Sequence, residues 1–218
     1  MIADTQNDPE LQFKHCIKAL ISQFSDLSWD DEDIYATWLA QTYFFVRHVT
    51  SLVSLAASRF GPDRRNLQYA QHKGVREEMD HDLLLLNDLA FLMRNILDFR
   101  EFPETSAFYH CQYYYVEHES PIALIGASLS LEGLSAAVGD ISGRLKKTFG
   151  TKAVSFISHH VTADKIHFRQ SFEQIKLLKD SEQKIVMKNV IQSPRLYSLM
   201  LTAVAQASGT RDITKKTG

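Results

Sequence analysis

Two histidines and an aspartate share one predicted helix face in the last third of the chain. His160, Asp164 and His167 stand at positions i, i+4 and i+7, which lie above one another if the segment is helical. Two imidazoles and a carboxylate on one stripe are a ligand set for a transition metal that prefers nitrogen and oxygen donors. The alternative is a solvated polar face whose charged side chains pair with neighbours. The metal interpretation requires ligands from other helices.

Three further residues could complete such a site. Glu78 and His81 form a Glu-x-x-His pair, which in ferritin-like bundles supplies a carboxylate and an imidazole to a metal pair. Glu77 is the rival carboxylate, on a different face. Glu132 stands alone in an apolar, small-residue segment, where burying a carboxylate is costly unless it is paired or binds a metal. An ion pair with Arg47 or Arg144 is the alternative for Glu132.

His48 is a further candidate ligand. It follows Gln41 by seven residues, so both share one helix face, although a core histidine bonded to a neighbour is an equal alternative. The whole set suits two iron or manganese ions better than zinc, because structural zinc prefers four-coordinate sites, usually with cysteine. The predicted metal ligands are Glu78, His81, Glu132, His160, Asp164, His167 and His48.

The composition narrows the class of protein. The 218 residues suffice for one domain, and a net charge of −2 without a basic block argues against a nucleic-acid partner. Two cysteines cannot build a disulfide framework and nothing resembles a secretory signal, so a cytoplasmic location is the default. The longest apolar stretch, residues 121–134, is too short for a membrane span and contains Glu132.

Helical periodicity without alternating strand patterns predicts an all-α chain of about seven to nine helices in one domain, residues 1–218. Ser28 is the predicted N-cap of a central helix, a break is expected near His81, and Pro194 should kink or divide the last helix. The expected helical segments are 9–25, 29–60, 64–100, 106–118, 121–150, 151–178 and 181 onward, with about 208–218 as a flexible tail.

The order of these motifs resembles the heme-oxygenase-like diiron proteins, within the superfamily of the TenA and PqqC proteins. That branch carries a first-helix acid, a Glu with a downstream His, a lone Glu, and His-x3-Asp-x2-His. The last motif is intact here. The lone Glu corresponds to Glu132 in Leu-Ser-Leu-Glu-Gly-Leu, and the Glu with a downstream His corresponds to Arg-Glu-Glu-Met-Asp-His, which ends at His81. The resemblance covers about residues 35–170. Gln41 falls where the first-helix acid is expected, so either His48 substitutes or one metal position is weakened.

The resemblance implies a heme-oxygenase-like bundle that holds iron, as two ions in the full site, or manganese, without haem. It implies an oxidase or oxygenase that uses dioxygen on a small, amine-bearing molecule in cofactor or secondary metabolism. Gln41, Tyr43 and Tyr114 are candidate substrate contacts, although aromatic residues are more often core. We expect no nucleic-acid or membrane partner, and a homodimer is one oligomeric state to test.

Two other functions stay open. A TenA-like hydrolase of a thiamin-related pyrimidine would need a nucleophilic cysteine beside an acid, and Cys111 is the candidate. A binding protein could keep the bundle and a ligand pocket without turnover. Neither alternative accounts for the clustered acids and histidines.

Overall fold

The computed structural model describes the backbone of residues 9–214 and the side chains there, apart from those of residues 9, 10, 12, 165–167, 170 and 208–214. Ten α-helices and no strand occur in this part of the chain. The helices are α1 (Pro9–Ser25), α2 (Glu32–Val46), α3 (Val49–Arg59), α4 (Arg65–Glu78), α5 (His81–Phe91), α6 (Pro103–Tyr114), α7 (Leu124–Ala137), α8 (Gly139–Phe149), α9 (Ser155–Lys176) and α10 (Asp180–Thr214). The predicted all-α class is confirmed.

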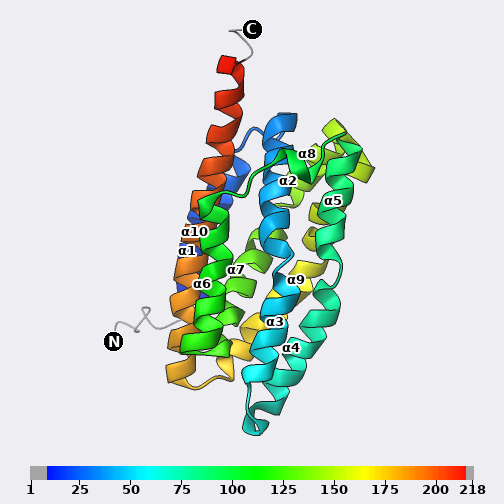
Figure 1. The fold of residues 1–218 in the computed structure, drawn as a ribbon. Coiled ribbons are helices and arrows are strands. Elements are labelled where there is room, and N and C mark those ends of the chain that lie inside the picture. The colour runs from blue at the N-terminus through cyan, green and yellow to red at the C-terminus, as the bar shows by residue number, and fades with distance from the viewer. Residues whose placement is uncertain (1–8, 215–218) are drawn as a thin grey trace, which may run out of the picture.

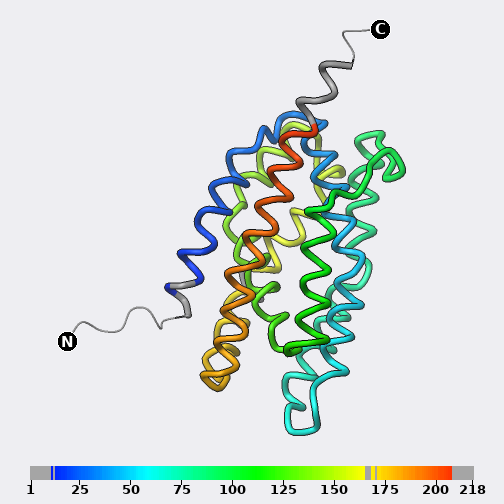
Figure 2. Tube along the Cα trace, turned by 60° about the vertical axis from the view of Figure 1, so that its left-hand side comes forward, coloured from blue at the N-terminus to red at the C-terminus, as the bar shows by residue number. Residues whose placement is uncertain are grey.

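The helices form an elongated bundle in which α7 lies at the centre (Figure 1). Helix α7 contacts α9, α10 and α1, and most of its residues are buried. Gly126 permits the close approach of α7 to α10, since a Cβ atom there would collide with the Val186 carbonyl oxygen. The hairpin of α3 and α4 extends at the lower end of the bundle, while α1 and α10 run side by side (Figure 2).

The described helices number ten because three of the seven expected segments are each two helices: 64–100 divides at the break predicted near His81, and two others divide where no break was predicted. The central helix expected over 29–60 is α2 and α3, interrupted at Arg47–His48, where the Arg47 Nε donates to the Phe44 carbonyl oxygen at 3.2 Å. The predicted N-cap was also wrong, because Asp31 rather than Ser28 caps α2 by accepting from the backbone N–H of Asp33 at 2.8 Å.

The helix expected over 121–150 is likewise two helices. Helices α7 and α8 meet at the buried Val138 with a bend of 61°. Within the described residues no single helix is long and apolar enough to cross a membrane, and only this bent pair reaches that length and hydropathy. Helix α10, by contrast, continues through Pro194 to Thr214, so the proline does not divide it. Residues 215–218 lie outside the described part, and the flexible tail stays a prediction.

The break near His81 is confirmed. Helix α4 ends at Glu78 and α5 begins at His81, with Met79 and Asp80 between them. Asp80 adopts the left-handed conformation, with φ of 67°, which aspartate tolerates better than most residues. The chain direction therefore changes between the two members of the Glu-x-x-His pair, so one side chain leaves the end of α4 and the other the start of α5.

A buried aspartate joins α5 to the start of α9. Asp88 is fully buried, and its carboxylate accepts from the backbone N–H of Ser155 at 2.8 Å, from the Ser155 hydroxyl at 2.5 Å and from the backbone N–H of Phe156 at 3.0 Å. Val154, at the N-cap position, has no side-chain acceptor of its own. Asp88 thus caps α9 from another helix and fixes the turn that leads to His160.

Replacing Asp88 should therefore destabilise the fold. Asp88→Ala leaves three buried donors without their acceptor, and we expect a loss of about 1–3 kcal/mol in the free energy of unfolding, measured by urea denaturation. Asp82→Ala, on the same helix, serves as control and should cost less than about 1 kcal/mol, since its charge acts only on the helix dipole. Equal losses in the two variants would contradict the capping role.

Candidate metal centre

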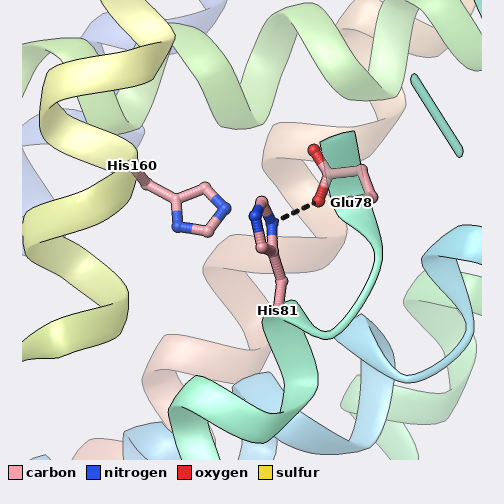
Figure 3. Close-up of side chains that lie close together, drawn as sticks. All are labelled: Glu78, His81 and His160. Atoms are coloured by element: carbon pink, nitrogen blue, oxygen red, sulfur yellow. Dashed lines mark hydrogen bonds and ion pairs between the residues drawn. The ribbon is translucent and has the colours of Figure 1, made fainter. Parts of the chain in front are cut away.

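Glu78, His81 and His160 bring their donor atoms to one point of the bundle. One ligand atom from each residue lies within 4.8 Å of the others. The Nδ1 of His81 lies 2.9 Å from the Glu78 Oε2, and the rings of His81 and His160 meet edge to face with centroids 4.8 Å apart. In Figure 3 the His81 ring stands between the other two side chains. Three separate helices, α4, α5 and α9, therefore supply this cluster.

The imidazole of His160 is oriented for metal binding. The Nδ1 of His160 lies 3.0 Å from the Phe156 carbonyl oxygen, an acceptor only, so Nδ1 carries the hydrogen and Nε2 keeps its lone pair. Figure 3 shows His160 directing its ring toward His81. Burial lowers the pKa of His160 to about 4, with His81 and His159 acting in the same direction, so the ring is neutral at pH 7. A neutral imidazole held by its second nitrogen is the form that binds metals.

His81 differs from His160 in its charge environment. Burial lowers its pKa, but the hydrogen bond and charge of Glu78 and the charge of Asp164 outweigh burial, so the pKa of His81 is raised. The neighbouring His159 is exposed, yet its ring packs against His81 with centroids 4.8 Å apart.

Two more carboxyl groups lie at the same cavity. Asp164 is 6% exposed, and its pKa is raised to about 7, chiefly by burial and by the charge of Glu78, against a hydrogen bond with Ser135. Glu132 accepts from the Ser171 hydroxyl at 2.9 Å, and burial, with Asp164 and Glu78, raises its pKa to about 8. Burial is the main cause of both shifts, and a cation bound among these groups would instead favour their ionised forms.

The arginines considered as partners of Glu132 bind elsewhere. Arg47 pairs with Glu101 at 3.1 Å and Arg144 with Asp30 at 3.4 Å. Glu77, the rival carboxylate, is exposed and pairs with Lys73 at 2.9 Å. Glu78 is therefore the member of the adjacent pair that joins the cluster.

The cluster opens on a cavity of about 250 Å³. Glu78, Glu132, His160 and Asp164 line one part of it, and apolar side chains of α2, α3 and α7 line much of the rest. The site therefore combines a polar donor set with space for a small molecule, as ligand sites in helical bundles do.

The sequence profile of the iron-containing redox enzyme family matches residues 36–196. This chain belongs to that family. The match includes every residue of the predicted metal site. No protein with a curated description is significantly similar in sequence.

Several solved structures share the fold of this chain. A domain of unknown function with a heme oxygenase-like fold from Shewanella denitrificans OS217 has a TM-score of 0.83 at 15% identity, covering 97% of this chain and 96% of its own. A TenA homologue from Pseudomonas syringae pv. tomato has a TM-score of 0.73 at 14% identity, covering 91% and 93%. A TenA homologue from Pyrococcus furiosus has a TM-score of 0.66 at 8% identity, covering 90% and 100%. These similarities confirm the predicted heme-oxygenase-like fold.

Four residues predicted for the site lie elsewhere. His48 was expected to face the same interior as His160, but its ring stacks on Tyr109 at 4.0 Å, its Nδ1 lies 3.4 Å from the Tyr113 hydroxyl, and it does not line the cavity. The end of α2 at Val46 changes the helix register, so the face shared with Gln41 does not reach His48.

Gln41 has a structural role instead of a substrate contact. It is fully buried, accepts from the Thr105 hydroxyl at 2.7 Å and from the Phe102 N–H at 3.0 Å, and donates to the Arg100 carbonyl oxygen at 2.9 Å. These three bonds hold the loop before α6 and the first turn of α6 against α2.

The two tyrosines also lie outside the cavity. Tyr43 packs edge to face on Phe44, with the Arg47 guanidinium over its ring, and Tyr114 is 58% exposed beside His118. Neither lines the cavity. Their placement follows from the registers of α2 and α6, which direct these positions away from α7 and α9.

His167 is in the helical part of α9, but its side chain lies outside the described residues, so its role as ligand stays a prediction.

Sequence reasoning missed the hydroxyl partners Ser135 and Ser171. A signal for Ser171 was present, because it continues the stripe of His160, Asp164 and His167 by four more residues. Ser135 stands three residues after Glu132, close to the same face of α7.

The raised carboxyl pKa values predict a pH dependence for metal-free protein. In the unfolded chain these carboxyls are ionised above about pH 5, whereas in the fold Asp164 keeps its proton to about pH 7 and Glu132 to about pH 8. The folded state then binds more protons than the unfolded state, so stability falls as the pH rises. The raised pKa of His81 also lowers the stability as the pH rises above 6.5, the ordinary histidine value. The lowered pKa of His160 affects the stability only below pH 6.5.

We therefore expect the free energy of unfolding to fall by on the order of 1–2 kcal/mol between pH 6.5 and pH 8 when a chelator is present. Guanidinium denaturation at a series of pH values measures this slope. Glu132→Gln removes one titrating group and should show a shallower slope. A stability that is constant or rises over this interval would contradict the protonated state of the cluster.

Proposed function

We propose that this protein holds iron and uses dioxygen to oxidise a small molecule in the adjoining cavity. The proposed iron ligands are Glu78, His81, Glu132, His160, Asp164 and His167. The observation that carries the proposal is the convergence of Glu78, His81 and His160, with Asp164 and Glu132 at the same cavity. Burying such carboxyl groups together is unfavourable unless a cation balances their charge.

The donor atoms fit iron. Carboxylate oxygens and imidazole nitrogens suit iron or manganese, whereas a structural zinc site would normally include thiolates. Neither Cys16 nor Cys111 lines the cavity. Bound iron would supply electrons to dioxygen, and the oxidation of the substrate depends on that chemistry.

The chain's own residues hold this donor set in place. The Phe156 carbonyl fixes the tautomer and direction of His160, and the Ser171 hydroxyl donates to Glu132. Ser135 does the same for Asp164. Such hydrogen bonds keep ligands oriented before the metal arrives, which reduces the cost of ordering them on binding.

The structural similarity to TenA homologues makes a hydrolase the second candidate. That function needs a nucleophilic cysteine at the cavity. Cys111 lies on α6, does not line the cavity, and has a pKa raised by burial and by Glu119, which disfavours the thiolate. The iron site has no such conflict, and we therefore favour it over hydrolysis and over passive ligand binding.

A pair of adjacent glutamates provides a matched test of metal binding. After loading with Fe(II) under nitrogen and gel filtration, the wild type should retain iron, measured by elemental analysis, and should melt at a higher temperature than the metal-free protein. Glu78→Gln should lose at least tenfold in affinity for iron and lose the thermal stabilisation, as expected for a ligand. Glu77→Gln, whose carboxylate pairs with Lys73, should keep both.

Retention of iron by Glu78→Gln and its loss by Glu77→Gln would show that the ligand is assigned to the wrong residue. Wild-type protein that binds neither iron nor manganese would overturn the proposal. Oxygen uptake by the iron-loaded protein in the presence of small amines then distinguishes oxidation from passive binding. Release of the pyrimidine from thiamin by the metal-free protein would favour the hydrolase.

A further inference from the structure

Two exposed points lie next to the metal cluster. The first is at the cavity, where the exposed side chains of Lys73 and Glu77 line the wall together with Glu78. The second is His159, which is exposed, does not line the cavity and packs its ring on that of His81. A metal ion from solvent therefore has two routes to the donor atoms, one through the cavity and one past His159.

His159 completes a triangle of three imidazole rings. Its ring centroid lies 4.8 Å from that of His81 and 5.4 Å from that of His160, while the His81 and His160 centroids are 4.8 Å apart. His159 is exposed, His160 is partly buried, and His81 is 9% exposed. The three rings thus lead from solvent into the cluster, and adjacent positions on α9 supply the outer ring and an inner one.

The spacing of these rings fits the transfer of a metal between them. Two imidazoles that bind one metal, with about 2.1 Å from each nitrogen to the ion, have ring centroids roughly 4.5–6.5 Å apart. Both separations from His159 fall within this range. Among the described residues, however, the donor atoms that converge belong to Glu78, His81 and His160. His159 is therefore placed to share a metal with one neighbour and not to complete the resident site.

An acidic residue also lies next to His81 at the surface. Asp80 is exposed in the break before α5, and its charge acts on the His81 ring. The Glu78 side chain, which is 30% exposed, bonds to the same ring. Acidic side chains raise the local concentration of cations. The exposed imidazole of His159 is thus placed where hydrated metal ions are attracted, and imidazole is a ligand that suits iron.

We propose that His159 is a transient ligand, which captures Fe(II) from solvent and passes it to His81 and His160. This inference rests on the proposed function, because it requires that the cluster binds iron. A nitrogen of His159 first replaces one water of the hydrated ion, and this bond breaks once His81 and His160 have bound. The metal stays Fe(II) throughout. Since His159 stabilises only the transition between solvent and site, it speeds uptake and release by the same factor and leaves the affinity unchanged.

Rate measurements distinguish such a ligand from a resident one. Metal-free, full-length protein is mixed with Fe(II) under nitrogen, and uptake is followed by tryptophan fluorescence, because Trp38 lines the cavity and packs on Phe156, which contacts His160. Release is measured by mixing the loaded protein with excess ferrozine, which forms a coloured complex with Fe(II). His159→Phe keeps an aromatic ring on His81 but removes both nitrogens. It should slow uptake and release by the same factor, about 3- to 10-fold, and keep the wild-type dissociation constant.

Two exposed residues serve as controls. His72→Phe removes an exposed imidazole on α4 that neither belongs to the cluster nor lines the cavity, so both rates should equal those of the wild type. Glu77→Gln tests the route through the cavity and should also leave both rates unchanged. Slower uptake in Glu77→Gln, with wild-type rates in His159→Phe, would show that the metal enters through the cavity and would overturn the inference.

Three further outcomes would also overturn it. Wild-type rates in His159→Phe would exclude this residue from uptake. Binding at least about tenfold weaker, with faster release, would make His159 a resident ligand. Slow rates in His159→Ala alone would show that only the packing on His81 matters. Wild-type protein that takes up no Fe(II) would instead overturn the proposed function, on which the inference rests.

Discussion

The cost of placing several carboxyl groups in a helical core is the constraint on which this structure depends. Glu132 and Asp164 hold their protons at pH values where exposed carboxyls are ionised, chiefly because both are buried, and the charge of Glu78 raises the pKa of each further. Hydrophobic contacts do not offset this free-energy cost, because apolar side chains of similar size would pack in the same space at a lower cost. A bound cation gives the cluster a physical reason to exist.

The architecture around the cluster reflects this constraint. The two-residue break at Met79–Asp80 places Glu78 and His81 on different helices, so that both reach the same point as His160. Asp88 ties the start of α9 to α5, which carries His81, and so fixes the relative position of the two imidazoles. The same helices leave a cavity with mostly apolar walls between the cluster and α2, and in the proposed function this is where a substrate would meet the metal.

The helical class and the break near His81 were predictable from the sequence, because helix periodicity and the polar-to-apolar change there indicate them. The meeting of Glu78, His81 and His160 was predictable too, as was the presence of Glu132 and Asp164 at the same cavity. The role of these residues as metal ligands stays a proposal. The division of the central helix at Arg47–His48 was not predictable, because no glycine or proline marks it in the sequence. His48 lies at this division, and its ring stacks on Tyr109 and does not line the cavity. Gln41 failed for another reason, because its partners come from a loop about 60 residues away in the chain.

Iron-edge anomalous diffraction from crystals grown with Fe(II) under nitrogen tests the central claim most directly. It locates the metal without reference to activity or to a substrate. The account predicts anomalous density bounded by Glu78, His81 and His160, with Asp164 and Glu132 at coordinating distance. Iron bound only at other positions, with this cluster free of anomalous density, would contradict it.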